Sequence, residues 1–236
     1  MPILRHMTKG LHVEFVASRQ LAPAVLDEIQ TIYEDAYLMV VHKPAGLLSV
    51  PGKTNEISLT GFLSEQNNGA YIMPVHRLDQ DTSGLIVMAK KVEIYKELQS
   101  YFQRRDIQKR YEALLAPNDS LHPVPDDGEI NLPLLPNPYD RPRQMVNTAH
   151  GKVAITRFHV RERRDNGLVF VDFYPLTGRT HQLRVHAAHP DGLNAPIVGD
   201  RLYGKAGERL MLHAAEITFV HPVKKEEMHF CIPSNF

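Results

Sequence analysis

Short apolar runs separated by turn residues alternate with a few longer amphipathic segments in the first half of the chain. Two such runs around Asp35-Ala36 predict a β-hairpin within residues 31–50. Apolar residues recur every three or four positions in 92–104, which is the spacing of an amphipathic helix. A second helix is expected near 59–65, and 108–115 has the composition of a strand.

The second half of the chain reads mostly as strands. Apolar and polar residues alternate from Lys152 to Arg163, and Asp165-Asn166-Gly167 is a hairpin turn signal before a returning strand. The other expected strands are 129–135, 168–174, 210–220 and 228–232, and the expected loops are 117–127 and 137–143.

One cluster of ionisable residues lies between two apolar runs. Residues 71–75 and 85–89 are apolar, and they are joined by His76-Arg77-Leu78-Asp79-Gln80-Asp81 followed by Thr82-Ser83-Gly84. This pattern is typical of a charged loop between two buried strands, where a carboxylate such as Asp79 borders the interior and its pKa can be tuned. By spacing alone, a surface turn with a local ion pair is the more common outcome.

A second polar cluster starts a predicted helix. Thr180 is placed to cap a helix that runs to about His189 and carries Arg184. By spacing alone this would be a basic helix with solvent-facing charges. His181, His186 and His189 raise the question of a metal site. The sequence has neither a cysteine pair nor a His-Glu-x-x-His pattern, so no metal is expected.

Composition places the chain among ordinary globular proteins. The 236 residues are 43% apolar and 23% charged, and no apolar run approaches the ~20 residues of a membrane-spanning helix. Residues 1–20 carry charges and lack the apolar segment of a secretory signal. The single cysteine, Cys231, excludes an internal disulfide and suits a reducing compartment, so a cytoplasmic location is expected.

The charge balance argues mildly against a nucleic-acid partner, because basic and acidic residues both number 27. The basic residues are clustered, however, and a neutral protein can still present a basic face to RNA. The clusters are Arg104-Arg105, Lys109-Arg110, Arg141 with Arg143, Arg161, Arg163-Arg164, and Arg179 with Arg184.

Three motifs resemble those of one enzyme family. His76 to Leu85 fills every fixed position of His-Arg-Leu-Asp-x-x-Thr-Ser-Gly-Leu, which resembles the signature of the RluA-type pseudouridine synthases. In that family the aspartate is the catalytic nucleophile, a role that falls on Asp79. Residues 177–186 resemble the family's Thr-Gly-Arg-x-His-Gln-Leu-Arg-x-His, whose second arginine pairs with the nucleophile, a role that falls on Arg184. Lys109-x-Tyr111 resembles the family's Lys-x-Tyr, and Tyr111 is expected to stack on a flipped-out base.

An earlier stretch resembles the family's first motif. Lys43-Pro44-Ala45-Gly46-Leu47 follows an apolar strand as that motif does, and the continuation 48–52, Leu-Ser-Val-Pro-Gly, is closest to the RluA branch. We expect Pro44 and Gly46 to set a turn that supports the site, with Lys43 as further support or as a phosphate contact.

The resemblance runs from about Ile32 to the last residue and implies an α+β fold, with a mixed, mainly antiparallel sheet and flanking helices. It implies a catalytic domain, 31–236, after an extension, 1–30, that is not the S4 RNA-binding domain of many relatives. The implied activity is conversion of specific uridines in RNA to pseudouridine. That reaction involves no redox change and no hydrolysis, so no cofactor and no metal are expected. A monomer is the simplest expectation.

The implied site has two sets of residues. The catalytic set is Asp79, Arg184 and Tyr111, and the substrate-binding set is His76, Arg77, Lys109, Arg179 and Leu183. Arg77 is expected to touch the RNA backbone or to fill the gap left by the base. The implied substrate is a stem-loop of ribosomal RNA, transfer RNA or both, and the alternative is the same chemistry at a different transfer-RNA position.

Two other classes of function remain open from the residues alone. A non-catalytic RNA-binding module would use the basic clusters and Tyr111 but would not need an ionised Asp79. A hydrolase built on His76 and Asp79 would need a third ligand or a Gly-x-Ser-x-Gly nucleophile turn, and the sequence has neither.

Overall fold

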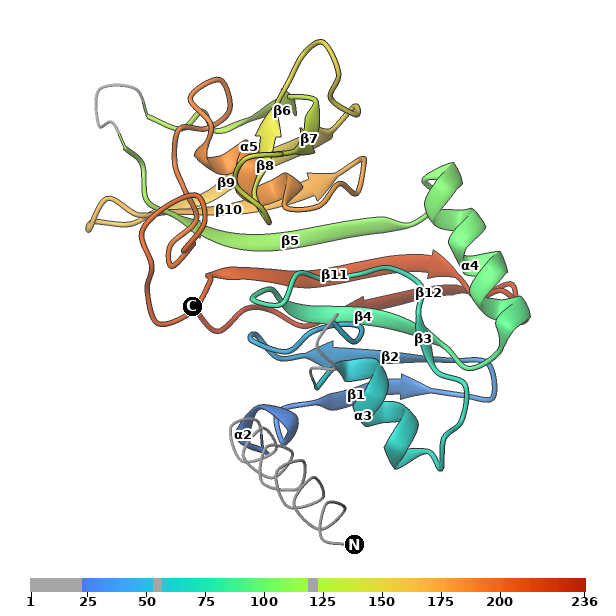
Figure 1. Cartoon of the computed structure of the whole chain (residues 1–236). Helices are drawn as coiled ribbons and strands as arrows, with labels where there is room; N and C mark the ends of the chain where they lie inside the picture. Colours follow the sequence, from blue (N-terminus) through green and yellow to red (C-terminus); the bar gives the residue numbers. More distant parts are fainter. Residues whose placement is uncertain (1–22, 53–56, 119–122) are drawn as a thin grey trace, which may run out of the picture.

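One mixed sheet organises the protein (Figure 1). The computed structural model describes residues 23–52, 57–118 and 123–236. Within them the ten-stranded sheet has the order β1-β2-β4-β11-β5-β10-β9-β6, with β12 beside β11 and β3 beside β4. Neighbouring strands are antiparallel except β4 and β11, which are parallel. The expected α+β fold with a mainly antiparallel sheet is confirmed, while most of the predicted extension, 1–30, lies outside the described residues.

The elements have the following bounds. The strands of the first half are β1 Gln30–Glu34, β2 Leu38–Lys43, β3 Met73–Pro74, β4 Ser83–Ala89 and β5 Gln108–Leu115. The later strands are β6 Asp127–Asn131, β7 Leu134–Pro136, β8 Gln144–Val146, β9 Ile155–Arg163, β10 Val169–Pro175, β11 Leu212–Val220 and β12 Glu227–Cys231. The helices are α2 Pro23–Leu26, α3 Leu59–Gln66, α4 Val92–Arg104 and α5 Gln182–Ala188.

Strand β4 separates two layers of core because its side chains alternate between the two faces of the sheet. Leu85 and Val87 pack in the cluster that contains α4 residues, whereas Ile86 and Met88 pack in the cluster that contains α3 residues. All seven residues of β4 are buried. Its unbroken apolar run is therefore that of a central strand covered on both faces by helices.

A third cluster fills the other half of the sheet. Residues of β5, β9 and β10 pack there against Leu183 and Ala187 of α5. On β9 the buried side chains are Thr156 and Phe158, which is the inward set that the alternation predicts. None of the described helices has the length and apolar character to cross a membrane.

Two strand predictions were wrong in their extent. The expected strand 129–135 is two strands, β6 and β7, because Pro133 between them has no N–H to donate to a ladder. The second of them pairs with β8, which lies just after the expected basic loop 137–143 and was not predicted. The apolar run 71–75 contributes only the two residues of β3.

Candidate active site

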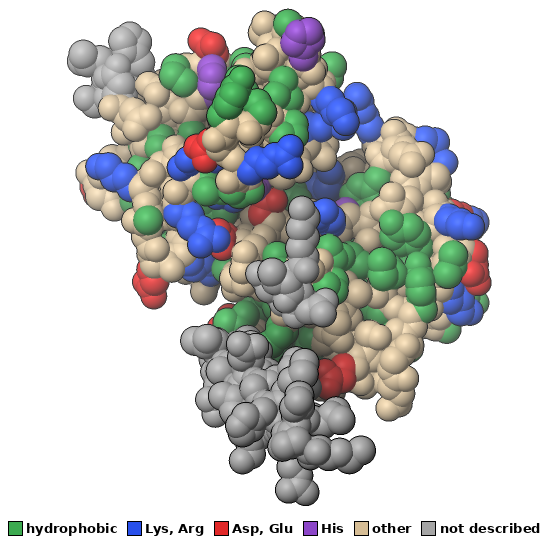
Figure 2. All heavy atoms as spheres, in the orientation of Figure 1, with side chains coloured by type: hydrophobic (Ala, Val, Ile, Leu, Met, Phe, Trp, Pro, Cys, Tyr) green, Lys and Arg blue, Asp and Glu red, His purple; other side chains and the backbone are tan. Residues whose placement is uncertain are grey.

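A cleft of about 1130 Å³ lies where the loop before β4 faces β5 and α5. All eight residues of the predicted site line it, and Asp79 is the only carboxylate among the described residues that do. Figure 2 shows Lys and Arg side chains around the hollow between the part of the molecule that carries α4 and the part that carries α5. The cleft is therefore a basic cavity with one acidic group inside it.

The loop that carries Asp79 is fixed by its backbone. Ser49 Oγ donates to the carbonyl oxygen of Leu78 at 2.8 Å and accepts from the Leu78 N–H at 3.2 Å. The N–H of Gly46 donates to Gln80 O, and the N–H of Thr82 donates to Asp79 O. The Leu78 side chain is buried in the cluster that contains α3. Because both neighbours of Asp79 are anchored, its carboxylate has a defined position at the edge of the core.

Lys43 completes this anchoring from beneath the loop. It is 0% exposed. Its ammonium donates to the carbonyl oxygens of Pro44, Leu47 and Gln80 at 2.8, 2.8 and 3.0 Å. Burial lowers the pKa of Lys43 to about 7, although Asp79 and Asp81 nearby favour its charged form. The three donors of an ammonium are used here, so the suggested phosphate contact was wrong and the expected role in supporting the site is confirmed.

Arg184 connects Asp79 to a second carboxylate. The side chain is 2% exposed. Its Nε and Nη2 donate to the two oxygens of Asp200 at 2.8 and 2.7 Å, and its Nη1 lies 3.6 Å from Asp79 Oδ2. Burial opposes the charge on Asp200, but the hydrogen bonds and charge of Arg184 outweigh it and lower the pKa of Asp200. The expectation of solvent-facing charges on this helix from spacing alone was therefore wrong.

Asp200 was not among the predicted site residues. It is 0% exposed, and its Oδ1 accepts the N–H groups of Leu202 and Tyr203. The sequence did carry a signal, because residues 197–204 resemble the family's Ile-x-Gly-Asp followed by Tyr-Gly. That resemblance did not show that Asp200 pairs with Arg184. A loop separates the two residues, and sequence spacing alone does not give the path of that loop.

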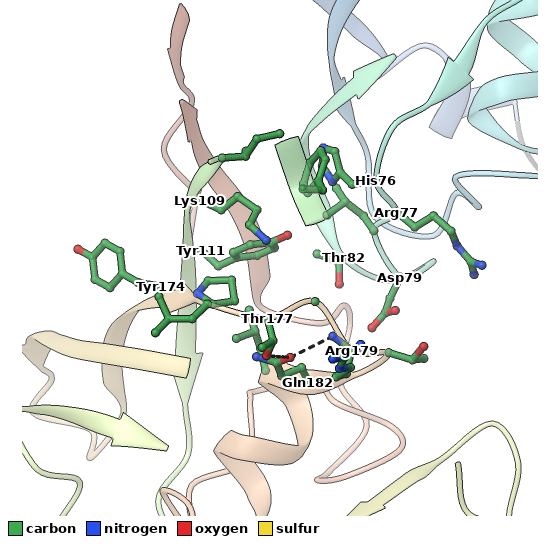
Figure 3. A pocket seen from close by; sticks show the side chains of 18 of the residues that line it. His76, Arg77, Asp79, Thr82, Lys109, Tyr111, Tyr174, Thr177, Arg179 and Gln182 are labelled. Atoms are coloured by element: carbon green, nitrogen blue, oxygen red, sulfur yellow. Dashed lines mark hydrogen bonds between the residues drawn. The ribbon is translucent and has the colours of Figure 1, made fainter. Parts of the chain in front are cut away.

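The turn before α5 is held by a side chain that the sequence did not single out. The Gln182 amide oxygen accepts from Thr177 Oγ1 and from the N–H of Arg179 (Figure 3), and its Nε2 donates to Ile155 O and Thr156 Oγ1. The helix begins after His181, whose φ is +54°, so the prediction that Thr180 caps the helix was wrong. The Gln182 hydrogen bonds hold the turn that precedes the helix.

His181 lies between Asp79 and Tyr203. Its Nδ1 is 2.8 Å from the Tyr203 hydroxyl, and its Nε2 is 3.9 Å from Asp79 Oδ2. Burial lowers the pKa of His181, and the charge of Asp79 opposes that shift. From the sequence, His181 was a motif residue and a candidate metal ligand, and no catalytic or binding role was predicted for it.

Tyr111 spans two of the hydrophobic clusters. It stands on β5 opposite Phe173 of β10 and Ala214 of β11, and it packs against the cluster of α5 and the cluster of α3. Burial and the charge of Asp79 both raise the pKa of Tyr111. The phenol is therefore neutral, and it can accept a proton only after its own proton has moved elsewhere.

The opposite end of the cleft has two basic residues, His76 and Lys109, in different environments. His76 accepts from the N–H of Val87 at 3.2 Å, and burial, with Lys109 nearby, lowers the pKa of His76 to about 3. Burial also lowers the pKa of Lys109 to about 8. Within the described residues the Lys109 ammonium has a ring contact with Phe102, at 5.6 Å, but no hydrogen bond or ion pair. His76 is thus a neutral structural acceptor, and Lys109 is a cation without a carboxylate.

The remaining predicted residues lie at the rim or in the wall. Arg77 is exposed, and Figure 3 shows its guanidinium directed away from Tyr111. Arg179 is exposed and donates from Nε to Val153 O, while Leu183 is buried. Other basic residues point elsewhere: Arg110 forms ion pairs with Glu112, Asp172 and Glu216. The basic clusters of the sequence are therefore partly structural.

The histidines that raised the question of a metal site are engaged in other contacts. His186 bonds Thr156 Oγ1 through Nδ1 and Leu132 O through Nε2. In the part of the chain that the structure describes, no three His, Cys, Asp or Glu side chains are arranged to hold a metal ion.

The chain is similar to known proteins over most of its length. The family model of RNA pseudouridylate synthases matches residues 37–189. The chain is 38% identical over 219 residues to the dual-specificity RNA pseudouridine synthase RluA of Haemophilus influenzae, covering 91% of this chain and 97% of that protein. It is 39% identical over 210 residues to the protein of the same name from Escherichia coli, covering 87% of this chain and 93% of that protein.

Two solved structures have a similar fold. Human RNA pseudouridylate synthase domain containing 1 has a TM-score of 0.72 and 26% identity, covering 89% of this chain and 84% of that one. Human RNA pseudouridylate synthase domain containing 4 has a TM-score of 0.70 and 24% identity, covering 93% of each chain.

Proposed function

The chain belongs to the RNA pseudouridylate synthase family and isomerises uridine in RNA, and from that premise we propose that Asp79 is the nucleophile, with Arg184 and Tyr111 as its catalytic partners. The observation that carries this proposal is the place of Asp79. It is the one described carboxylate lining a basic cleft, and the buried guanidinium of Arg184 lies 3.6 Å from it. A nearby cation favours the ionised carboxylate, which is the reactive form.

The reaction breaks the C1′–N1 bond of the target uridine, turns the uracil and joins its C5 to C1′. Asp79 is 27% exposed on its side chain, so it is accessible to a nucleotide and still bounded by the core. The arrangement is compatible with attack at the sugar, attack at the base, or removal of a sugar proton. Each of these steps requires an ionised carboxylate in a fixed position, which the anchored loop supplies.

Tyr111 supplies the surface for the displaced base. A uridine in folded RNA must leave the stack before its glycosidic bond can be reached. Stacking on an aromatic ring contributes ~1–3 kcal/mol per base. The Tyr111 ring lines the cleft and is braced by two hydrophobic clusters, so it is ordered before RNA arrives. Leu183 is placed to contact the same base from α5.

The basic residues of the cleft are suited to the RNA backbone. Arg77 and Arg179 are exposed at the rim, and Lys109 has no carboxylate partner in the described parts of the chain. Such groups contribute affinity that falls with salt concentration, because phosphate contacts release counterions. His76 is the exception in the substrate-binding set, since its Nε2 accepts from the Val87 N–H and burial keeps its ring neutral, so it offers no cation to the RNA backbone.

The substrate range follows the relatives. The curated relatives are called dual-specificity enzymes. We therefore propose that the substrate is a stem-loop that occurs in both ribosomal and transfer RNA. We also propose that the catalytic domain, 31–236, is a monomer and acts in the cytoplasm. Modification of a different transfer-RNA position is the alternative, and mapping the modified uridine separates the two.

The test is release of tritium from RNA labelled at uridine C5. Native protein should release tritium from total ribosomal and transfer RNA, and Asp79→Asn should release none. Asp81→Asn is the matched control, because Asp81 is two residues away and its ion pair is with Arg201 at 3.1 Å. Release by the Asp79→Asn variant at the native rate would refute the assignment of the nucleophile. Intact RNA binding without release by the native chain would favour a binding module.

A further inference from the structure

His181 presents a polar atom to the reacting end of the cleft that the reaction described above does not use. The side chain is 9% exposed, and its Nε2 lies 3.9 Å from Asp79 Oδ2, beyond hydrogen-bond distance. Within the described residues Nε2 makes no closer polar contact. Asp79 Oδ2 is therefore flanked by two nitrogen groups, Arg184 Nη1 and His181 Nε2. The Arg184 guanidinium is also paired with Asp200 through Nε and Nη2, whereas among the described residues His181 pairs with no other carboxylate.

The hydrogen bonds of Tyr203 determine which nitrogen of His181 carries the proton. The N–H of Gln144 donates to the Tyr203 hydroxyl oxygen at 2.7 Å. The hydroxyl hydrogen has one further partner in the described residues, His181 Nδ1 at 2.8 Å. If Tyr203 donates to Nδ1, the Gln144 N–H, the Tyr203 hydroxyl and His181 Nδ1 all have hydrogen-bond partners. The proton of neutral His181 is then on Nε2. An Nε2–H also faces the Asp79 carboxylate favourably, whereas a lone pair there would be repelled.

The fixed backbone of His181 supports this orientation. Its φ of +54° is in the left-handed region, which non-glycine residues adopt uncommonly. The ring packs edge-on against Tyr203, with centroids 5.6 Å apart. Burial lowers the pKa of His181, so the ring is neutral at physiological pH and donates from one nitrogen only. The side chain is thus a preset donor rather than a mobile surface histidine.

The chemistry of the target nucleotide identifies the acceptor. The base stacks on Tyr111, and Asp79 acts at the sugar-to-base bond, so a donor beside Asp79 Oδ2 meets the ribose. Two ribose oxygens lie next to the reacting carbon, the ring oxygen and the 2′-hydroxyl. The ring oxygen must supply electrons when the glycosidic bond weakens, and a hydrogen bond to it would oppose the reaction. The 2′-hydroxyl has no such conflict, and it is the group that distinguishes RNA from DNA.

We infer that His181 Nε2–H donates a hydrogen bond to the 2′-hydroxyl of the target uridine, and that His181 is therefore a residue that selects ribose over deoxyribose. This inference rests on the proposed function, because it places the ribose beside Asp79. It assigns Tyr203 and Gln144 as positioning residues, which act through the ring of His181 and do not touch the substrate.

The test combines two changes in the enzyme with one change in the RNA. Asn places its amide near the position of His Nδ1 and tolerates a positive φ, so His181→Asn keeps the Tyr203 contact and deletes the donor beside Asp79. Gln places its amide near the position of Nε2, so His181→Gln keeps that donor. The RNA is a synthetic oligonucleotide that contains the mapped uridine, or 2′-deoxyuridine at that one position. Single-turnover rate constants are measured for each pair.

The variant His181→Asn and the deoxy substrate should each lower the rate constant, and their combined effect should be smaller than the sum of the two. For native protein the deoxy substrate should react about tenfold more slowly, the size of one net hydrogen bond. His181→Asn should react about tenfold more slowly on the ribose substrate and show nearly the same rate on both RNAs. His181→Gln should retain part of the preference for ribose. An undiminished preference in His181→Asn would overturn the inference.

A second measurement needs no variant of His181. The ¹⁵N chemical shifts of the His181 ring in the native protein should show a proton on Nε2 and none on Nδ1. In Tyr203→Phe, which lacks the hydroxyl, the Nδ1 form should become populated and the ribose preference should fall. A native ring with its proton on Nδ1 would overturn the inference. Failure of the proposed function would look different, since native protein would then produce no pseudouridine from either RNA.

Discussion

Arg184 forms its two short hydrogen bonds to Asp200, at 2.7 and 2.8 Å, and reaches Asp79 only at 3.6 Å. The bidentate pair fixes the plane of the guanidinium and leaves Nη1 directed at the proposed nucleophile. Asp200 thus holds the cation in place, and Asp79 receives its field without being locked in a short ion pair. A carboxylate in that position is free to move toward a substrate.

Replacing Asp200 by Asn tests this arrangement. The variant leaves the buried Arg184 charge with a weaker partner, and breaking a buried pair costs about 3–5 kcal/mol. Single-turnover pseudouridine formation should fall by about a hundredfold or more, because a shift of the guanidinium changes the geometry around Asp79. Chemical denaturation should show the loss in the free energy of unfolding. Asp79→Asn is the control, since it leaves the Arg184–Asp200 pair intact and should abolish turnover with little change in unfolding.

Lys109 should contribute one salt-dependent contact with RNA. Its ammonium has no carboxylate partner among the described residues, so it is available to form an ion pair with an RNA phosphate. In Lys109→Met, the slope of log Kd against log salt should fall by about one relative to native protein. Lys109→Arg should keep the slope. An unchanged slope in Lys109→Met would show that Lys109 does not contact phosphate.

The same contact should weaken at alkaline pH. Burial lowers the pKa of Lys109 to about 8 in the free protein. A bound phosphate favours the charged amine, so the complex binds the proton more tightly than the free protein does. Affinity for RNA should therefore fall as the pH rises through about 8 and level off above the pKa of the complex. This component should be missing in Lys109→Met when Kd is measured from about pH 7 to 10.

His186 should make the fold sensitive to acid. It is 0% exposed, and burial lowers the pKa of His186 to about 4. An unfolded histidine takes up its proton near pH 6.5. Between these values the unfolded chain binds more protons than the folded one, so stability is complete above about 6.5 and falls as the pH drops, by up to ~1.4 kcal/mol per unit.

Urea unfolding of native protein and His186→Gln, at pH values of about 7.5 and 5, measures the contribution of His186 to the pH dependence of the free energy of unfolding. Native protein should lose about 1–2 kcal/mol more than the variant over that range, and contributions from other histidines cancel in the difference. The exposed His150→Gln is the matched control and should behave as native protein does. Equal losses in native protein and His186→Gln would contradict the prediction.

Two glycine-to-alanine changes should affect stability in opposite directions. Gly84 has a φ of +118°, and a Cβ there would lie 2.3 to 2.7 Å from backbone atoms of Ala214. Gly84→Ala should therefore cost more than about 4 kcal/mol or prevent folding. Gly61 lies inside α3 with ordinary space for a methyl group, so Gly61→Ala should stabilise by about 0.5–1 kcal/mol. Thermal unfolding of both variants decides the sign of each effect.

Short-range patterns predicted the elements well where one physical cause dominates. The helix at 92–104 and the strand at 108–115 have the expected bounds, and the amphipathic period specifies the helix. The charged loop at Asp79 was predicted because apolar runs border it on both sides. Pro133 was present in the sequence, but its effect on the expected strand was overlooked.

The site was predictable only as far as its motifs extend. They placed Asp79, Arg184 and Tyr111 in one cleft, as the structure does. They did not indicate that Arg184 is held by Asp200 or that Lys43 is buried under the loop. Those contacts depend on how distant segments pack, and the same residue types on a surface would have given the same sequence pattern. The position of Thr180 suggested a helix cap, but the residue before the helix is His181, whose side chain forms no capping hydrogen bond.

The proposed site is assembled from segments far apart in the chain, which has a consequence for biosynthesis. Strands β4 and β11 meet at Ser83 with His213 and at Gly84 with Ala214, just after the loop of Asp79. Arg184 and Asp200 come from chain that follows that loop by about a hundred residues or more of synthesis. A nascent chain that has emerged through β4 therefore carries Asp79 without the Arg184 guanidinium beside it. Under the proposed roles, the catalytic site is complete only after Arg184 and Asp200 have been synthesised.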